Sequence, residues 1–387
     1  MKIKPTGHFN TNRDKKAKIF GVINRISSWP GIGYEYSRSM NRVDKKVSKL
    51  SGVSIGEVEI NKNCNLNCVM CRSWDSKRKN IYMDLEIFRR ACVEAKRLGN
   101  KKINIYTIGE PLLNPYLEHY FEILHEFNLK AFVSTNGLLL HKNNNIDLLC
   151  RNAKVIQAIR FSVDGVTKET YEKIRTPGNF NRLLENLELF KDANQDNKLK
   201  VYFNSVLSKD NKDEIARYYS FYSRYTDMLN IDVGLMNGLC PDNSYFFKAS
   251  ILPYHIKRNI PCDTWLFNKK LHVLCNGDVT ACCRDYHGDL IYGNIMDNTA
   301  EKLINSRKVV ALRNEHLNKL VSEDKLCANC YIVDRRVTNL FNLFVKQMVI
   351  KYRMNWDEER MQGRFNRFFD LFQDRIPSIQ EFTWLCR

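Results

Sequence analysis

Short hydrophobic runs alternate with amphipathic segments from about residue 53 onward. The runs are rich in β-branched residues and a helix-like stretch follows most of them, the pattern of repeated β–α units on a parallel sheet. The predicted strands are Val53–Ile60, Ile103–Ile108, Leu129–Ser134, Ile156–Ser162, Lys200–Val206 and Asn230–Leu235. Six such units predict an α/β fold, a partial (β/α)6 TIM-like barrel. A flat, doubly wound sheet is the alternative that counting strands does not exclude.

Helical spacing of apolar residues fills the gaps between these strands. Asp84 is an expected N-cap, and Gly99 is the expected end of the helix that follows it. Asn114-Pro115 begins a second helix, because proline suits the first helical turn. A later helix should turn the stripe Phe180, Leu183, Leu187 and Phe190 toward the core, and another should run from about Asp213 to Tyr225.

The pattern changes again near residue 240, where a cysteine-rich segment begins. Asn276-Gly277 between two β-rich runs predicts a hairpin over Leu271–Cys283. The aromatic stripe Phe365, Phe368, Phe369 and Phe372 predicts a helical tail packed on a neighbouring domain, with membrane-surface or nucleic-acid contact as the alternative. The expected divisions are a basic extension (1–52), the barrel (53–245), a small cysteine-rich domain (246–335) and the tail (336–387).

Composition narrows the classes of protein that fit. The 387 residues carry a formal net charge of +18, and 44% of them are hydrophobic. No apolar run reaches the roughly 18 residues that a membrane span needs, and the N-terminus has no signal-peptide core. The 13 cysteines therefore indicate a reducing, cytoplasmic location and metal binding. The charge reflects either a solvated surface or an anionic partner: a phosphorylated metabolite, an activated sugar, an acidic peptide, nucleic acid or a lipid surface.

Three of these cysteines occur in one short run. Cys64, Cys68 and Cys71 have C-x3-C-x2-C spacing and follow the first predicted strand. Three thiolates cannot all pair as disulfides, but they can converge on one metal centre, and soft ligands favour an iron–sulfur cluster or zinc. A four-iron cluster held by three cysteines keeps one iron open. A zinc site completed by His119 or by a distant cysteine is the alternative.

The other predicted strand ends also carry unusual residues. The carboxyl ends of parallel strands meet at one rim, where ligands bind, so these short motifs should converge there. They are Gly109-Glu110-Pro111, Ser134-Thr-Asn136-Gly137, Ser162-Val-Asp164-Gly165 with Arg175, Asn204, and Gly238 with Cys240.

This combination resembles the radical S-adenosylmethionine (SAM) enzymes, whose mark is a C-x3-C-x2-C run after the first strand. The resemblance implies that Cys64, Cys68 and Cys71 hold a [4Fe–4S] cluster whose open iron binds SAM. Gly109 and Glu110 resemble the family's glycine–glutamate motif near the methionine amino group, although Ile108 replaces its first glycine. The same resemblance places Ser134 and Asn136 at the ribose, and Ser162 with Arg175 at the methionine carboxylate.

A second cysteine set resembles the SPASM or shorter twitch extension of these enzymes. By that resemblance one auxiliary [4Fe–4S] cluster is held by Cys262, Cys282, Cys327 and Cys330. A four-cysteine zinc ribbon is the alternative. Cys283 should point to the opposite strand face from Cys282. Cys92 and Cys150 are expected in the core.

The resemblance implies hydrogen abstraction from a C–H bond by a 5′-deoxyadenosyl radical. The expected substrate is a small anionic metabolite of the sugar or aminocyclitol type, undergoing dehydrogenation or epimerisation, with flavodoxin or ferredoxin as electron donor. In an epimerisation Cys240 could return a hydrogen atom; an inert buried thiol is the alternative. Modification of a ribosomally made peptide or of tRNA are the alternative functions.

Overall fold

The structure is a computed structural model of the chain. It describes residues 53–71, 73–79, 82–196, 198–226, 229–232, 270–318, 320–322, 327, 344 and 357–372. The predicted basic extension (1–52) therefore lies outside the described residues, as do most of the predicted tail and residues 233–269.

The described strands form a nine-stranded sheet in the order β6-β5-β4-β3-β2-β1-β7-β8-β9. The first six strands pair in parallel and in chain order, without the reversal that defines a doubly wound sheet. The sequence-based prediction of a partial barrel is thus confirmed, and the flat alternative is wrong. These strands are β1 (Ser54–Val58), β2 (Lys102–Asn104), β3 (Lys130–Thr135), β4 (Ile156–Ser162), β5 (Val201–Val206) and β6 (Leu229–Asp232).

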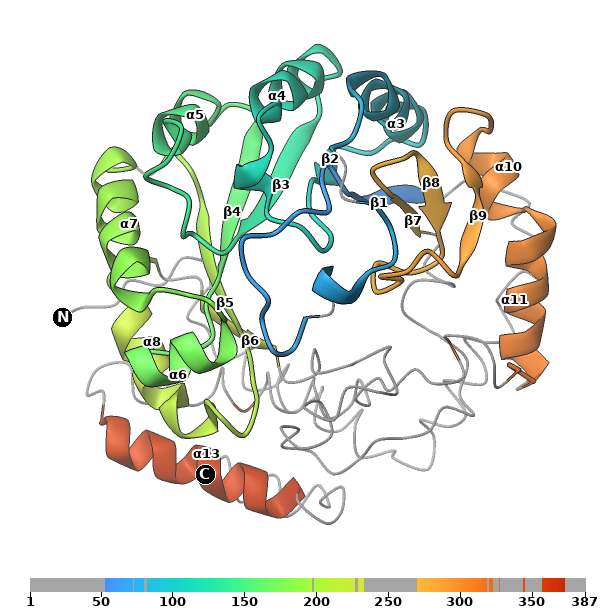
Figure 1. Cartoon of the computed structure of the whole chain (residues 1–387). Helices are drawn as coiled ribbons and strands as arrows, with labels where there is room; N and C mark the ends of the chain where they lie inside the picture. Colours follow the sequence, from blue (N-terminus) through green and yellow to red (C-terminus); the bar gives the residue numbers. More distant parts are fainter. Residues whose placement is uncertain are drawn as a thin grey trace, which may run out of the picture.

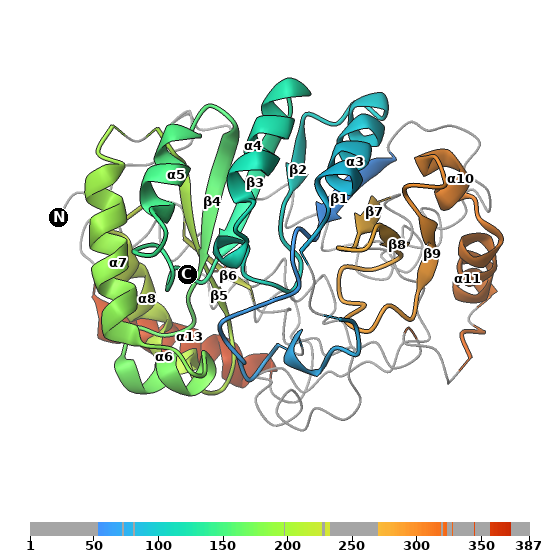
Figure 2. The same cartoon turned by 45° about the horizontal axis from the view of Figure 1, so that its top comes forward.

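Helices cover the outer side of this curved sheet (Figures 1 and 2). Their amphipathic stripes explain the arrangement, since Phe180, Leu183, Leu187 and Phe190 of α7 are all buried as predicted. The helices of the barrel are α3 (Leu85–Arg97), α4 (Leu117–Glu126), α5 (Asn145–Arg151), α6 (Lys168–Ile174), α7 (Phe180–Ala193) and α8 (Ile215–Tyr222), with the 3-10 turns η2 (Ser73–Asp75), η3 (Pro111–Leu113) and η4 (Lys212–Glu214).

Side chains alternate between the two faces of each strand, and this alternation defines the inner wall. The Phe161 ring of β4 lies 5.4 Å from that of Phe190, so Phe161 faces the helices. Its neighbours Arg160 and Ser162 therefore lie on the inner face. Parallel register places Ser134 of β3 and Tyr202 of β5 beside Arg160 at the same height.

A hairpin lobe extends the sheet beyond β1. β7 (Lys270–Val273) pairs in parallel with β1, and β8 (Asp278–Thr280) and β9 (Ile291–Asn294) follow antiparallel. The predicted Asn276-Gly277 turn connects β7 and β8, and Gly277 has a φ of +83° that favours glycine. The lobe continues into α10 (Ala300–Ile304) and α11 (Arg307–Asn318), which the sequence analysis did not predict.

Helix α13 (Glu358–Phe372) packs against α8, as the aromatic stripe predicts for the described part of the tail. Phe365, Phe368 and Phe369 are buried. The Gln362 side chain accepts a hydrogen bond from Ala216 N at 3.1 Å and donates one to the Lys212 carbonyl at 2.9 Å. In the part of the chain that the structure describes, no helix has both the length and the apolar character required for a membrane span.

Several parts of the predicted pattern differ in the structure. Helix α4 begins at Leu117 and not at Asn114-Pro115, because Asn114 ends the 3-10 turn η3. Strand β2 ends at Asn104 instead of Ile108, because the chain leaves the sheet to pass Gly109 closely along another loop. Helices α5 and α6 were not predicted, since each is only seven residues long and shows little periodicity. Thr167 caps α6 by accepting a hydrogen bond from Thr170 N at 3.3 Å.

Candidate active site

The cysteine loop directly follows β1 and is fixed against the end of α6. Val69 N donates to the Ile174 carbonyl at 3.0 Å, and Cys71 N donates to the Cys68 carbonyl at 2.9 Å. Cys68 is buried, Cys64 and Cys71 are half-buried, and none of the three forms a disulfide.

The electrostatics of these thiols fit an iron-binding role. Burial, reinforced by Glu110 and by the neighbouring cysteines, raises the pKa of Cys64 to about 12. Burial and Cys71 raise the pKa of Cys68 to about 11, against the opposing charge of Arg175. Thiolates are thus unfavourable here without a cation, and three grouped soft donors suit the irons of a cluster. The residues present therefore fit a [4Fe–4S] cluster.

Gly109 lies where the loop after β2 crosses the residues preceding the cysteine loop. An added Cβ would lie 2.3 Å from the Asn61 carbonyl oxygen and 2.9 Å from that of Asn63, so only glycine fits without backbone movement. Glu110 N donates to the Asn63 carbonyl at 2.8 Å. The two loops are therefore held together by backbone contacts.

The Glu110 carboxylate is directed into the protein and is only 2% exposed. It accepts hydrogen bonds from Asn136 N at 2.7 Å, Thr135 Oγ1 at 2.7 Å and Leu112 N at 3.1 Å. Burial raises its pKa, although these three donors oppose the shift. Its side chain thereby positions the end of β3, while its backbone N–H and carbonyl are held by Asn63 and by the Asn61 amide.

The ends of β3 and β4 bring the predicted serine and asparagine positions together. The Asn136 amide donates to Asn65 Oδ1 in the cysteine loop at 2.9 Å. Ser134 Oγ and Ser162 Oγ lie 3.4 Å apart on neighbouring strands. The sequence-based expectation that these motifs share one rim is met by this geometry; their roles toward SAM stay predictions.

Arg175, at the end of α6, lies between the rim and the cysteine loop. It forms a buried ion pair with Asp164, and its Nη1 lies 3.8 Å from Cys68 Sγ. Although burial alone would lower it, the pKa of Arg175 is raised, because Asp164 and Cys68 both stabilise the cation. Asp164 also accepts a hydrogen bond from Val206 N at 2.6 Å. Arg175 is therefore placed to orient the cysteine loop, a contact that the sequence did not reveal.

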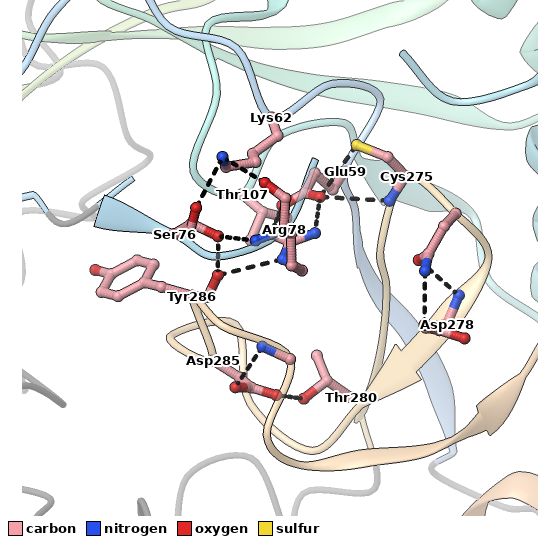
Figure 3. Close-up of polar contacts among 12 residues, drawn as sticks. Glu59, Lys62, Ser76, Arg78, Thr107, Cys275, Asp278, Thr280, Asp285 and Tyr286 are labelled. Atoms are coloured by element: carbon pink, nitrogen blue, oxygen red, sulfur yellow. Dashed lines mark hydrogen bonds and ion pairs between the residues drawn. The ribbon is translucent and has the colours of Figure 1, made fainter. Parts of the chain in front are cut away.

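A junction of polar residues joins the segment after the cysteine loop to the hairpin lobe (Figure 3). Arg78 binds Glu59 through two nitrogens, at 2.6 and 2.8 Å, and its Nε donates to the Tyr286 carbonyl at 3.2 Å. Cys275 Sγ donates to Glu59 Oε1 at 3.0 Å. Lys62 Nζ donates to the Arg78 carbonyl at 2.9 Å. The junction fixes the lobe against the loop that carries the cysteine triplet.

Cys282 of the predicted auxiliary set lies just past β8, beside Cys283. The two thiols are hydrogen-bonded to one another, and this contact together with burial raises the pKa of Cys282. The prediction that they point to opposite faces is wrong, because β8 ends at Thr280 and the alternation of a strand no longer applies. Cys283 also lies within 4.8 Å of side-chain atoms of Glu57 and His272, two buried residues that contact each other across β1 and β7.

The remaining cysteines divide into described and undescribed positions. Cys327 is half-buried against the core, whereas Cys240, Cys262 and Cys330 lie outside the described residues. Cys92 is fully buried, which agrees with a core role. Cys150 is only half-buried, and its thiol lies 3.8 Å from the Ala193 carbonyl oxygen.

Two family profiles match this chain. The profile of the radical SAM superfamily matches residues 58–222, and that of the SPASM family, an iron-sulfur cluster-binding domain, matches residues 262–331. The first covers the barrel with its cysteine loop, and the second covers the hairpin lobe and the CxxC segment at Cys327. The predicted domain boundaries enclose both matches and otherwise stay predictions.

Curated relatives match parts of the chain. An AdoMet-dependent heme synthase from Methanosarcina barkeri is 29% identical over 163 residues, which are 42% of this chain and 44% of that protein. A GTP 3′,8-cyclase from Aliarcobacter butzleri is 30% identical over 142 residues, 34% of this chain and 41% of that protein. The chain thus spans less than half the length of these relatives.

Solved structures share the fold at low sequence identity. anSMEcpe with bound AdoMet has a TM-score of 0.50 and 18% identity, with coverage of 81% of this chain and 99% of the other. Streptococcus suis SuiB has a TM-score of 0.50 and 15% identity, covering 82% of this chain and 81% of its own. The two matches imply SAM and [4Fe–4S] clusters as the cofactors. Residues 58–222 of this chain form a radical SAM domain, and residues 262–331 a SPASM iron–sulfur domain that follows the partial barrel.

Proposed function

We propose that this protein uses SAM to abstract hydrogen from a C–H bond of a small anionic metabolite of the sugar or aminocyclitol type, leading to dehydrogenation or epimerisation. In this proposal Cys64, Cys68 and Cys71 hold the SAM-binding cluster. The SAM site is lined by Gly109, Glu110, Ser134, Asn136, Ser162 and Arg175. When bound, the reduced cluster supplies the electron that cleaves SAM to the 5′-deoxyadenosyl radical.

The observation that carries the proposal is the set of contacts between the cysteine loop and the other rim loops. Asn136 binds Asn65 within the loop, and Arg175 approaches Cys68 while paired with Asp164. The Glu110 carboxylate orients Asn136 by accepting a hydrogen bond from the Asn136 backbone N–H. Loops that follow three separate strands thus hold the cysteine loop and the residues around it in place. This supports a preorganised site, which a reactive intermediate needs.

Barrel and lobe geometry support an oxidative outcome. Cys282 follows β8, the strand that pairs with β7. It is a proposed cluster ligand together with Cys262, Cys327 and Cys330. Its neighbour Cys283 lies close to His272 and Glu57 on the inner wall. An auxiliary cluster at Cys282 would adjoin the barrel wall at β1 and β7, and its proposed role is to accept an electron from the substrate radical. Epimerisation, with Cys240 as hydrogen donor, is the redox-neutral form of the proposal.

The proposed electron donor is a flavodoxin or ferredoxin, and the free cysteines and clusters suit a reducing compartment. The net charge of +18 supports an anionic substrate. Radical modification of a peptide and modification of tRNA are the alternatives that the experiment must separate.

The proposal is tested with anaerobically reconstituted protein, dithionite and SAM. Formation of 5′-deoxyadenosine is expected, with a larger rate when the substrate is present. Candidate substrates are nucleotide-activated sugars, aminocyclitols, short peptides and bulk tRNA, each supplied in deuterated solvent or with deuterated substrate to follow the abstracted hydrogen. A protein that binds iron but yields no 5′-deoxyadenosine would contradict the proposal. Stimulation by peptide or tRNA alone would replace its substrate class.

A further inference from the structure

Arg160 lies on the inner face of β4, two residues before the rim serine Ser162. Its height along the sheet matches that of Ser134 and Tyr202 through the parallel register. Two residues along a strand correspond to about 7 Å, so the root of Arg160 lies one pleat deeper in the barrel than Ser162. Its side chain therefore faces the barrel interior below the proposed SAM carboxylate position.

Two aromatic rings and one serine fix the Arg160 guanidinium. Its central carbon lies 4.6 Å from the Tyr106 ring centroid and 5.8 Å from that of Phe132. Its Nε donates to Ser134 Oγ at 3.1 Å. Burial raises the pKa of Tyr106 while the nearby guanidinium opposes the shift through its charge and a hydrogen bond, so the phenol stays neutral. The cation is thus held in place by neutral groups only.

The positive charge of Arg160 has no carboxylate partner within 4.0 Å among the residues described by the structure, whereas Arg78 and Arg175 each have one. Arg78 is paired with Glu59, and Arg175 with Asp164. The inner-wall carboxylate of Glu57 is paired with His272. Guanidinium has five N–H donors, and an uncompensated cation in a partly desolvated place is a strong site for an oxyanion.

We propose that Arg160, backed by Tyr106 and Phe132, binds a carboxylate or phosphate of the substrate inside the barrel. This inference rests on the proposed function and names the chemistry that its substrate must carry. An anion held by Arg160 would place the rest of the molecule against the inner wall near Ser134 and Ser162, where the proposed SAM site begins. The methionine carboxylate of SAM is the competing source of the same chemistry, and the test must separate the two.

The test uses the reconstituted holoenzyme with saturating SAM and inorganic phosphate as the probe. Arginine modification by phenylglyoxal is mapped by peptide mass spectrometry in the wild-type protein, so the result does not depend on a variant folding. Phosphate is expected to slow modification of Arg160 at least fivefold. Phosphate should not change the rate at which phenylglyoxal modifies the exposed Arg217. Equal modification of Arg160 with and without phosphate would overturn the proposal.

Variants then distinguish the two anion sources. Arg160→Gln should bind labelled SAM within twofold of wild type and should still form 5′-deoxyadenosine from SAM alone. Phosphate should inhibit formation of 5′-deoxyadenosine by this variant at least tenfold more weakly than formation by wild type. Arg160→Lys keeps the charge but loses the paired N–H donors of the guanidinium, so its inhibition by phosphate should be intermediate between those of wild type and Arg160→Gln. Arg217→Gln is the matched control. A tenfold loss of SAM affinity in Arg160→Gln, with phosphate inhibition intact, would assign Arg160 to SAM and contradict the proposal. A wild-type protein that forms no 5′-deoxyadenosine would instead refute the proposed function.

Discussion

The surroundings of the arginine at the junction differ from those of the arginine on the inner wall of the barrel. At the junction, the Arg78 cation meets the fully buried Glu59 carboxylate through two hydrogen bonds, and the surrounding donors complete the network. On the inner wall, Arg160 rests on aromatic rings and a serine, with no carboxylate partner in the described part of the chain. The buried ion pair of Arg78 with Glu59 indicates a structural role, whereas the place of Arg160 on the inner wall, without a counter-ion among the described residues, supports the proposed ligand site.

The largest expected effect comes from breaking the junction. Arg78→Met leaves the carboxylate of Glu59 buried without its cation and should lower the free energy of unfolding by about 3–5 kcal/mol. Chemical denaturation of the metal-free and reconstituted protein measures this. The double variant Glu59→Met with Arg78→Met should recover much of the loss, since neither charge then remains buried. The exposed pair of Arg151 with Glu118 is the control, where Arg151→Met should lower the stability far less than Arg78→Met does.

A second contact between barrel and lobe depends on pH. The Glu94 carboxylate of α3 accepts a hydrogen bond from Ala300 N of α10 at 2.9 Å and pairs with Arg97 and Arg90. Burial opposes its ionisation, but these partners outweigh burial and lower its pKa below the ordinary 4.5. Its stabilisation is therefore complete above pH 4.5 and is lost as the pH falls through the lower folded-state value.

Glu94→Gln should consequently lower the free energy of unfolding by about 2 kcal/mol at pH 7. The difference from wild type should shrink as the pH falls from about 4.5 through the lower folded-state pKa of Glu94, where the wild-type carboxyl also becomes neutral. Denaturation series at several pH values measure this, with the exposed Glu86 of the same helix substituted as control. A difference that does not change with pH would mean that the charge of Glu94 is not the source of its contribution.

The smallest expected effect on stability is at Arg160. Arg160→Met removes the ring contacts and the guanidinium hydrogen bonds to the uncharged Ser134 and Tyr106, so the free energy of unfolding should change by about 1 kcal/mol. No buried carboxylate is left unpaired, in contrast to the junction. A loss as large as that of Arg78→Met would show that Arg160 supports the fold, and the contrast between the two regions would then fail.

Much of the fold and the cysteine site was predictable because the signals are local. The spacing of Cys64, Cys68 and Cys71 lies in one loop, and the convergence of the rim motifs follows from parallel strands. The hairpin at Asn276-Gly277 is encoded by two residues. The turn after β8 was misjudged, since no sequence signal marks the end of the strand before Cys282.

The charge network of the site was not predictable, because it joins residues far apart in the chain. Glu57 meets His272 across two strands that become neighbours only when the lobe folds onto β1. Arg160 did leave a signal, since parallel strands are usually near-continuous hydrophobic runs and a charged residue between Ile159 and Phe161 interrupts this one. Its meaning depends on the absence of a counter-ion within the described residues, which only three-dimensional structure reveals.

The central claim is most directly tested by iron content and SAM cleavage in the variant with Cys64, Cys68 and Cys71 all replaced by alanine. Wild-type protein reconstituted under anaerobic conditions should hold about eight irons per chain, as expected for two four-iron clusters, and should convert SAM to 5′-deoxyadenosine with dithionite. The triple variant should keep about four irons and form no 5′-deoxyadenosine. Unchanged iron content, or continued formation of 5′-deoxyadenosine without these three thiols, would contradict the account.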